Sequence, residues 1–285
     1  MRITRPSSTR RQLWLANSLK AELLRLIKRR MSAAKRQDED VEEWHELYSE
    51  LNAVSEGFKV SFKTEPYAQV DRRCSMLAGP FFITPEFPAP AGASGLVMYP
   101  VVQFELSVLS TALEDTIGTG LLQLWFDIPS GQPLIRVIPQ QVVESQAPVD
   151  FLVHPIDPDD AFPLPEWQEK DPVKNGVKTI RGLTSCGCQS TCDLSDTDCL
   201  VRSNEQDEWL RTLLAAFADA TEASPEATGH MVAGGTLRAI QYNHSDVQMR
   251  PLLQFADWGS SGSAEIFFRT HKNKPTEFSF WACVN

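Results

Sequence analysis

At 285 residues, the chain is long enough to bury a large core, either as one domain or as two modest ones. Its composition, with 42% hydrophobic and 22% charged residues, is ordinary for a globular protein. The sequence contains no run of about 18 apolar residues, the length needed to span a bilayer. Residues 1–36 carry a net charge of +10 and the other 249 residues carry −20. An acidic body disfavours nucleic acid as a ligand and favours a basic partner.

Two helices are predicted at the N-terminus. Between residues 10 and 31 the apolar residues recur at helical spacing, and basic residues crowd the polar side. Residues 38–56 contain eight acids and no base, with apolar residues on one helical stripe. We predict a helical hairpin that neutralises its own charge; the alternative is that residues 10–31 contact a membrane surface or an anionic partner. Polar residues from Asn17 onward interrupt any secretion signal, so a cytoplasmic protein is expected.

Two stretches of the chain read as copies of one another. In each, a block that starts with Met precedes a block that contains Gln-Phe, and a third, mostly apolar block begins with Gly. The blocks are residues 76–80, 101–104 and 120–126 in the first copy, and residues 231–235, 252–255 and 262–268 in the second. A shared order of blocks indicates an internal duplication. Short connections between blocks of strand length favour antiparallel pairing.

The predicted fold class is α+β, with internally duplicated, mostly antiparallel sheet units and an N-terminal helical hairpin. The predicted segments are the helical hairpin (1–57), a first sheet repeat (58–143), a connecting region with a cysteine loop (144–204), and a helix with the second sheet repeat (205–285). We expect the last three segments to form one domain over residues 58–285.

Four cysteines lie within 14 residues, with the spacing C-x-C-x3-C-x6-C: Cys186, Cys188, Cys192 and Cys199. Thiolates bind zinc tetrahedrally, and disulfides are rare in the cytosol, so a zinc site is one interpretation. The spacing differs from the two C-x2-C pairs of a zinc knuckle, which leaves disulfide or redox pairing and plain thiols open. Because no histidine lies within the cluster, a structural metal is favoured over a catalytic one.

Two glutamines and a histidine are candidates for a ligand or partner pocket. Gln103 and Gln254 take equivalent places inside apolar, strand-like runs, where an amide without partners would cost about 1 to 3 kcal/mol. In one interpretation the two glutamines line a pocket between the halves. In the other, which we favour, each glutamine forms hydrogen bonds with backbone groups where the sheets meet. His230 precedes the second Met block in what has the look of a tight loop.

The repeated blocks resemble the YwqG-like family of bacterial proteins of unknown function, over about residues 55–285. Residues 75–82 (Ser-Met-Leu-Ala-Gly-Pro-Phe-Phe), 102–104 (Val-Gln-Phe) and 120–127 (Gly-Leu-Leu-Gln-Leu-Trp-Phe-Asp) are similar to its front half. Residues 229–235 (Gly-His-Met-Val-Ala-Gly-Gly), 252–255 (Leu-Leu-Gln-Phe) and 266–268 (Ile-Phe-Phe) are similar to its back half. The chain departs from the family's pattern at both glycine turns, in the cysteine loop and in the long basic N-terminus.

The resemblance implies an α+β fold with internal duplication in a cytosolic bacterial protein, and it implies no established reaction. Members of the family are sometimes found near polymorphic toxin systems, which suggests a toxin-neutralising immunity role. The commonest hydrolase and nucleotide-binding motifs are missing from the sequence: Gly-x-Ser-x-Gly, His-Glu-x-x-His and the phosphate-binding glycine loop.

These observations favour a non-enzymatic, partner-binding protein, of immunity type or otherwise. One alternative is a metal-binding protein or metal-dependent enzyme that uses the cysteine loop. The other is a small-ligand binder with its pocket between the two halves, around Gln103 and Gln254.

Overall fold

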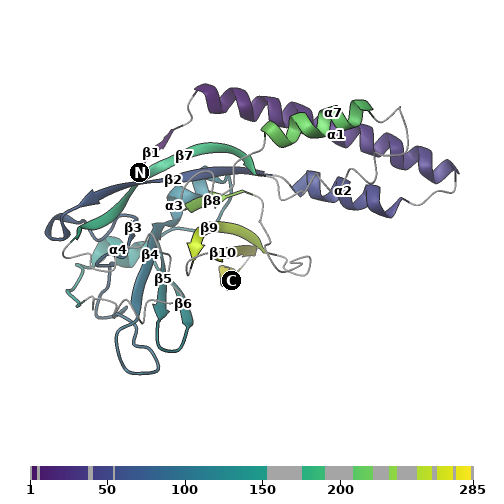
Figure 1. Cartoon of the computed structure of the whole chain (residues 1–285). Coiled ribbons are helices and arrows are strands. Elements are labelled where there is room, and N and C mark those ends of the chain that lie inside the picture. Colours follow the sequence, from purple (N-terminus) through teal and green to yellow (C-terminus); the bar gives the residue numbers. More distant parts are fainter. Residues whose placement is uncertain are drawn as a thin grey trace.

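The computed structural model describes residues 2–4, 7–37, 41–53, 55–152, 175–189, 208–220, 231–235, 249–258, 262–271 and 274–283. Within these ranges the chain forms a large, curved sheet from which a helical arm projects to one side (Figure 1). No helix in the described ranges combines the length and the apolar character that crossing a membrane requires.

The helical arm consists of α1 (Ser7–Gln37), α2 (Glu42–Ala53) and α7 (Glu208–Ala220). Its core contains apolar side chains from all three helices: Ala16, Leu23, Ile27, Leu47, Leu51, Leu210, Leu213, Leu214 and Phe217. The buried residues of α1 recur at helical spacing, so one side of this helix faces its neighbours. The predicted pairing of α1 with α2 is present, and α7, which we expected beside the second sheet repeat, packs on α1.

The strands are β1 (Arg2–Thr4), β2 (Ser55–Glu65), β3 (Met76–Leu77), β4 (Tyr99–Glu105), β5 (Leu121–Asp127), β6 (Gln132–Ile138), β7 (Val177–Gln189), β8 (Met231–Gly234), β9 (Arg250–Trp258), β10 (Gly262–His271) and β11 (Lys274–Cys283). In the described part of the chain, ten of them form one antiparallel sheet in the order β11-β10-β9-β8-β2-β7-β3-β4-β5-β6, and β1 pairs with β7 in parallel. Three short helices in the described ranges accompany them: η1 (Tyr67–Gln69), α3 (Leu106–Ala112) and α4 (Gln140–Ser145). The predicted α+β class with a mostly antiparallel sheet is confirmed.

Two four-stranded meanders flank the central pair formed by β2 and β7. The first meander comprises β3 to β6 and the second comprises β8 to β11; in each, strands that follow one another in the chain are neighbours in the sheet. β2 precedes the first meander in the chain but borders β8 of the second, whereas β7 borders β3 of the first. The central pair is antiparallel and joins distant parts of the sequence, since Phe62 is paired with Ile180.

The pairing register gives the two meanders equivalent positions. The equivalent cross-strand triplets are Met76–Gln103–Gln123 and Val232–Gln254–Glu265. This register agrees with the predicted alignment of the second and third sequence blocks. The first block is shifted by one residue, because Met76 takes the position of Val232 and not that of Met231. Although the meanders share this arrangement, the internal duplication itself stays a prediction.

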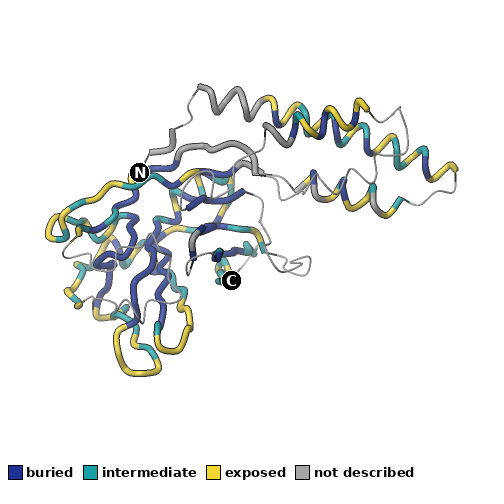
Figure 2. Tube along the Cα trace, in the orientation of Figure 1, coloured by how far each residue is buried: buried dark blue, intermediate teal, exposed yellow. Residues whose placement is uncertain are grey.

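The main core fills the inner face of the sheet and draws on both meanders (Figure 2). The end strands β6 and β11 approach one another, so the sheet is nearly closed. Phe126 on β5 meets Phe280 on β11 and Trp258 on β9, with ring centroids 6.4 and 6.0 Å away. Aromatic contacts between the two meanders therefore help to close the sheet.

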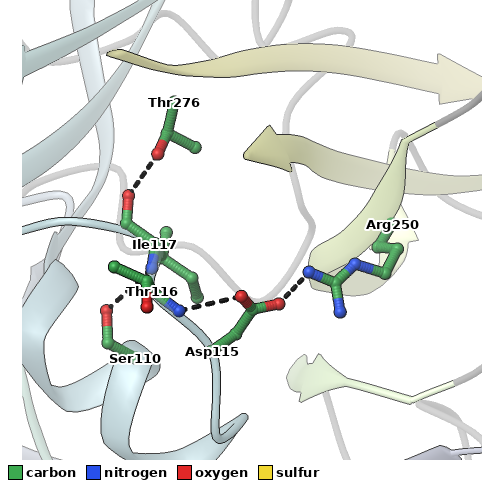
Figure 3. Close-up of polar contacts among 6 residues, drawn as sticks. All are labelled: Ser110, Asp115, Thr116, Ile117, Arg250 and Thr276. Atoms are coloured by element: carbon green, nitrogen blue, oxygen red, sulfur yellow. Dashed lines mark hydrogen bonds and ion pairs between the residues drawn. The ribbon is translucent and has the colours of Figure 1, made fainter. Parts of the chain in front are cut away.

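The loop between α3 and β5 joins the first meander to the second (Figure 3). Asp115 forms an ion pair with Arg250 on β9, and Thr276 Oγ1 on β11 donates a hydrogen bond to the Ile117 carbonyl at 2.5 Å. Ser110 Oγ on α3 accepts a hydrogen bond from the Ile117 N–H at 3.3 Å. The loop is thus fixed both to its own helix and to the second meander.

Candidate functional site

Gln103 is fully buried on the outward face of β4, because its neighbours along the strand contribute to the main core. Its Oε1 accepts hydrogen bonds from the Phe82 N–H at 2.9 Å and from Gln123 Nε2 at 2.7 Å. Its Nε2 donates to the carbonyls of Arg72 and Cys74, both at 2.8 Å. The amide therefore makes all four of its hydrogen bonds within the chain.

Gln123, opposite Gln103 on β5, is also fully buried and makes four hydrogen bonds. Its Nε2 donates to Gln103 and to the Phe82 carbonyl at 2.7 Å, and its Oε1 accepts from Trp125 Nε1 at 3.1 Å and Arg136 Nε at 2.8 Å. The Arg136 guanidinium lies over the Trp125 ring, 5.3 Å from the ring centroid. Burial lowers the pKa of Arg136 to about 10.

These side chains hold the segment between β3 and β4 over the outward face of the first meander. Both backbone groups of Phe82 bond to the two glutamines, and the Pro88 carbonyl accepts from Arg136 Nη1 at 2.6 Å. The Asp127 carboxylate accepts a hydrogen bond from the Ala93 N–H at 3.0 Å. In the first meander, these polar side chains on the outward face thus anchor the backbone of the segment between β3 and β4.

The second meander carries a different pair at the equivalent positions, Gln254 on β9 and Glu265 on β10. Both side chains are buried, and both point outward because they alternate with residues of the main core. Gln254 Nε2 donates a hydrogen bond to the Gly234 carbonyl at 2.6 Å. Ser263 Oγ lies 3.3 Å from Glu265 Oε1, while Glu265 Oε2 is buried and has no hydrogen-bond partner among the described residues.

Glu265 is a carboxyl group in a place that suits a neutral amide. The side chain is only 2% exposed, and this burial raises its pKa to about 7, although the hydrogen bond from Ser263 acts in the opposite direction. The equivalent residue of the first meander, Gln123, carries no charge. Near neutral pH, Glu265 therefore changes between a tolerated neutral form and a costly buried anion.

The structure does not bring the predicted pocket residues together. Gln103 on β4 and Gln254 on β9 are separated by four strands, β3, β7, β2 and β8, and both point away from the main core. His230 lies outside the described residues. For Gln103, the arrangement seen is that of an amide that satisfies backbone groups.

The cysteine loop is described only in part. The backbone of Cys186 and Cys188 lies in β7, where Cys188 is paired with Glu56 on β2, but neither side chain is among the described ones. Cys192 and Cys199 lie outside the described residues. Within the described ranges, no group of three or more His, Cys, Asp or Glu side chains could hold a metal ion. A zinc site formed by the four cysteines stays a prediction.

Metal content and thiol reactivity test this site directly. If the four cysteines bind zinc, protein purified without chelator should contain about one zinc per chain, with four thiols protected until the metal is removed. Cys74 is a useful internal reference, because burial raises the pKa of its thiol to about 12 and makes it slow to alkylate with or without metal. Protein without zinc, with these four thiols reacting at once, would contradict the site.

The helical arm presents charge on its outer side. Among the side chains of α1 that the structure describes, the cations exposed to solvent are Arg25, Lys28, Arg29, Lys35 and Arg36. Arg25 pairs with Glu22 on the same helix, which leaves the positive charge of α1 in excess. Trp209, in the first turn of α7, is 61% exposed. A basic surface and an exposed aromatic side chain therefore lie on two helices that pack against each other.

Three residues of these arrangements were not singled out by sequence reasoning: Gln123, Arg136 and Glu265. A signal was available for Glu265, because it is the only acid in the third block of the second copy. In the predicted alignment of the two copies, Glu265 already takes the position equivalent to that of Gln123. The role of Arg136 depends on contacts across β5 and β6, and no pattern in the sequence indicates it.

No protein-family model matches the chain, and no curated protein matches it either. The resemblance to the YwqG-like family accordingly stays an expectation from the sequence.

Proposed function

We propose that this chain is a non-enzymatic protein-interaction protein and that its partner docks on the helical arm. The proposal is based on the structure of this arm. It projects from the sheet (Figure 1), and the apolar side chains of its three helices already pack against one another. The outer side of α1 then offers solvent-exposed cations, and α7 adds the exposed Trp209. Tryptophan and arginine are enriched among the residues that dominate binding energy at protein interfaces.

The chemistry of the arm favours an acidic protein surface as the partner. Insertion into a membrane surface requires an exposed apolar face, whereas Ala16, Leu23 and Ile27 of α1 are buried against α2 and α7. The arm therefore binds through charge, with Trp209 as an apolar contact. Neutralisation of a toxin by an immunity-type complex in the cytoplasm is the most concrete form of this function, and it rests on the family resemblance.

Residues 37–285, which include α2 and α7 of the arm, carry −20 and, as expected from the sequence, favour a basic partner. The affinity of a partner that contacts only the sheet would not depend on the charge of α1. Charge reversal on the arm and on the sheet separates the two modes of binding.

Reversal of two cations on α1, Lys28→Glu with Arg29→Glu, should weaken capture of the partner from its native lysate by about tenfold or more. The wild-type complex should also weaken as salt is raised, because salt screens exposed charges. The matched control reverses two exposed cations of the sheet, Lys59 on β2 and Arg181 on β7, with the same change in net charge. Binding lost only in the sheet variant, or lost equally in both, would contradict docking on the arm.

A further inference from the structure

The exposed cations of α1 form one stripe along the C-terminal half of the helix. Lys28 and Lys35 are seven residues apart, as are Arg29 and Arg36, and Arg25 precedes Lys28 by three residues. Residues at these spacings lie on the same side of an α-helix. Lys28, Arg29 and Lys35 have no ion-pair partner among the described residues. The stripe therefore presents positive charge that the described part of the chain does not neutralise.

The helix α2, which packs on α1 in the arm, carries the opposite charge (Figure 1). Its sequence contains four glutamates and no lysine or arginine. Glu42 and Glu46 are both exposed, and at four residues apart they lie on one side of the helix. Glu46 has no ion-pair partner among the described residues. One arm thus presents a basic helix surface and an acidic one.

Glu46 and the three unpaired cations do not meet within one chain, because they point away from the core of the arm. In this core, α1 contributes Leu23 and Ile27, and α2 contributes Leu47 and Leu51. The charged side of each helix therefore faces solvent. A second copy of the chain presents the same two surfaces, so the basic stripe of one copy and the acidic side of α2 of another are complementary.

We infer that the chain associates with a second copy of itself, with α1 of one copy lying along α2 of the other. The cations of α1 recur every three or four residues and the exposed acids of α2 are four residues apart, so successive turns of the two helices place opposite charges together. Complementary charges across an interface fix its register and disfavour other arrangements.

This inference does not rest on the docking of a different protein on the arm, since it concerns the purified chain alone. Both interactions use the cations of α1, so a second copy and the proposed partner compete for them. Self-association without capture of a partner would contradict only the proposed function. Capture of a partner by a chain that does not self-associate would contradict only this inference.

Sedimentation velocity of the purified full chain measures the self-association, at protein concentrations up to about 100 μM and at low and high salt. The wild-type chain should associate at low salt and more weakly at high salt, because salt screens the paired charges. Lys28→Glu with Arg29→Glu should raise the Kd of self-association by about tenfold or more, since acids then face acids. Glu42→Lys with Glu46→Lys should have the same effect, since cations then face cations.

A mixture of the two variants separates a lost contact from a damaged fold. The α1 surface of the first variant and the α2 surface of the second are again opposite in charge, so the mixture should recover the wild-type Kd to within about threefold. A chain with all four substitutions should associate with itself equally well. The matched control, Lys59→Glu with Arg181→Glu on the sheet, should associate like the wild type.

Three results would overturn the inference. The first is a wild-type chain that stays monomeric over the whole concentration range at low salt. The second is an α1 variant or an α2 variant that associates as tightly as the wild type. The third is a mixture of the two variants that associates no more tightly than either variant alone.

Discussion

Replacing Glu265 with Gln should raise the free energy of unfolding by about 3 kcal/mol above about pH 7 and change it little near pH 4. Burial raises the pKa of Glu265 from 4.5 to about 7, so the folded state holds this proton more tightly than the unfolded state does. As the pH rises from 4.5 toward 7, the wild-type protein loses stability, and the loss is complete above about pH 7. The amide of the Glu265→Gln variant stays neutral, so this variant escapes the loss.

Urea unfolding of both proteins between about pH 4 and pH 8 measures the effect, since the difference in unfolding free energy should grow across this range. The control is Glu144→Gln, whose difference from the wild type should stay within about 0.5 kcal/mol at every pH because the side chain is exposed. A difference between wild type and Glu265→Gln that does not vary with pH would show that Glu265 has an ordinary pKa in the folded protein.

Replacing Gln103 with Leu should lower the free energy of unfolding by about 3 to 5 kcal/mol at all pH values. Leucine has a similar size but no polar atoms, so each of the four groups that bond to Gln103 loses one hydrogen bond. These groups are the Phe82 N–H, Gln123 Nε2, which keeps its bond to the Phe82 carbonyl, and the carbonyls of Arg72 and Cys74. Each unsatisfied buried group costs about 1 to 3 kcal/mol before the structure relaxes.

Denaturant unfolding measures the loss, and hydrogen exchange at the Phe82 amide reports whether the segment between β3 and β4 has been released. Gln140→Leu on α4 is the matched control, because Gln140 is partly exposed and its side-chain amide donates to the exposed Glu144. We expect its effect to stay within about 0.5 kcal/mol. A similar small effect for Gln103→Leu would mean that the segment is held by its apolar contacts alone.

The sequence predicts which segments form helices and strands better than it predicts which of these elements pack or pair with one another. Helical spacing of apolar residues identified α1, α2 and α7, and strand-length apolar blocks identified the meanders. Spacing cannot say which elements meet, because long-range pairing depends on the whole core. The pairing of β2 with β7 and of α7 with α1 therefore appears only in the structure.

The candidate site was predicted in part for a similar reason. Gln103 and Gln254 stood out because an amide interrupts an apolar run, and the register does place them at equivalent positions. Their contacts depend on side chains that reach across strands, such as Arg136 to Gln123, and on the state of ionisation of Glu265. The local sequence indicates neither these cross-strand contacts nor the ionisation state of Glu265.

Because β2 borders the second meander and β7 borders the first, the order in which the strands are synthesised has a consequence for folding. The inner edge of the first meander is β3, and its neighbour β7 leaves the ribosome about a hundred residues later. Until then, one edge of β3 and both edges of β2, whose neighbours β7 and β8 come later in the chain, expose unpaired backbone groups that can pair with other nascent chains. The newly made first half is thus an incomplete sheet, and the risk of aggregation ends only when β7 and the second meander arrive.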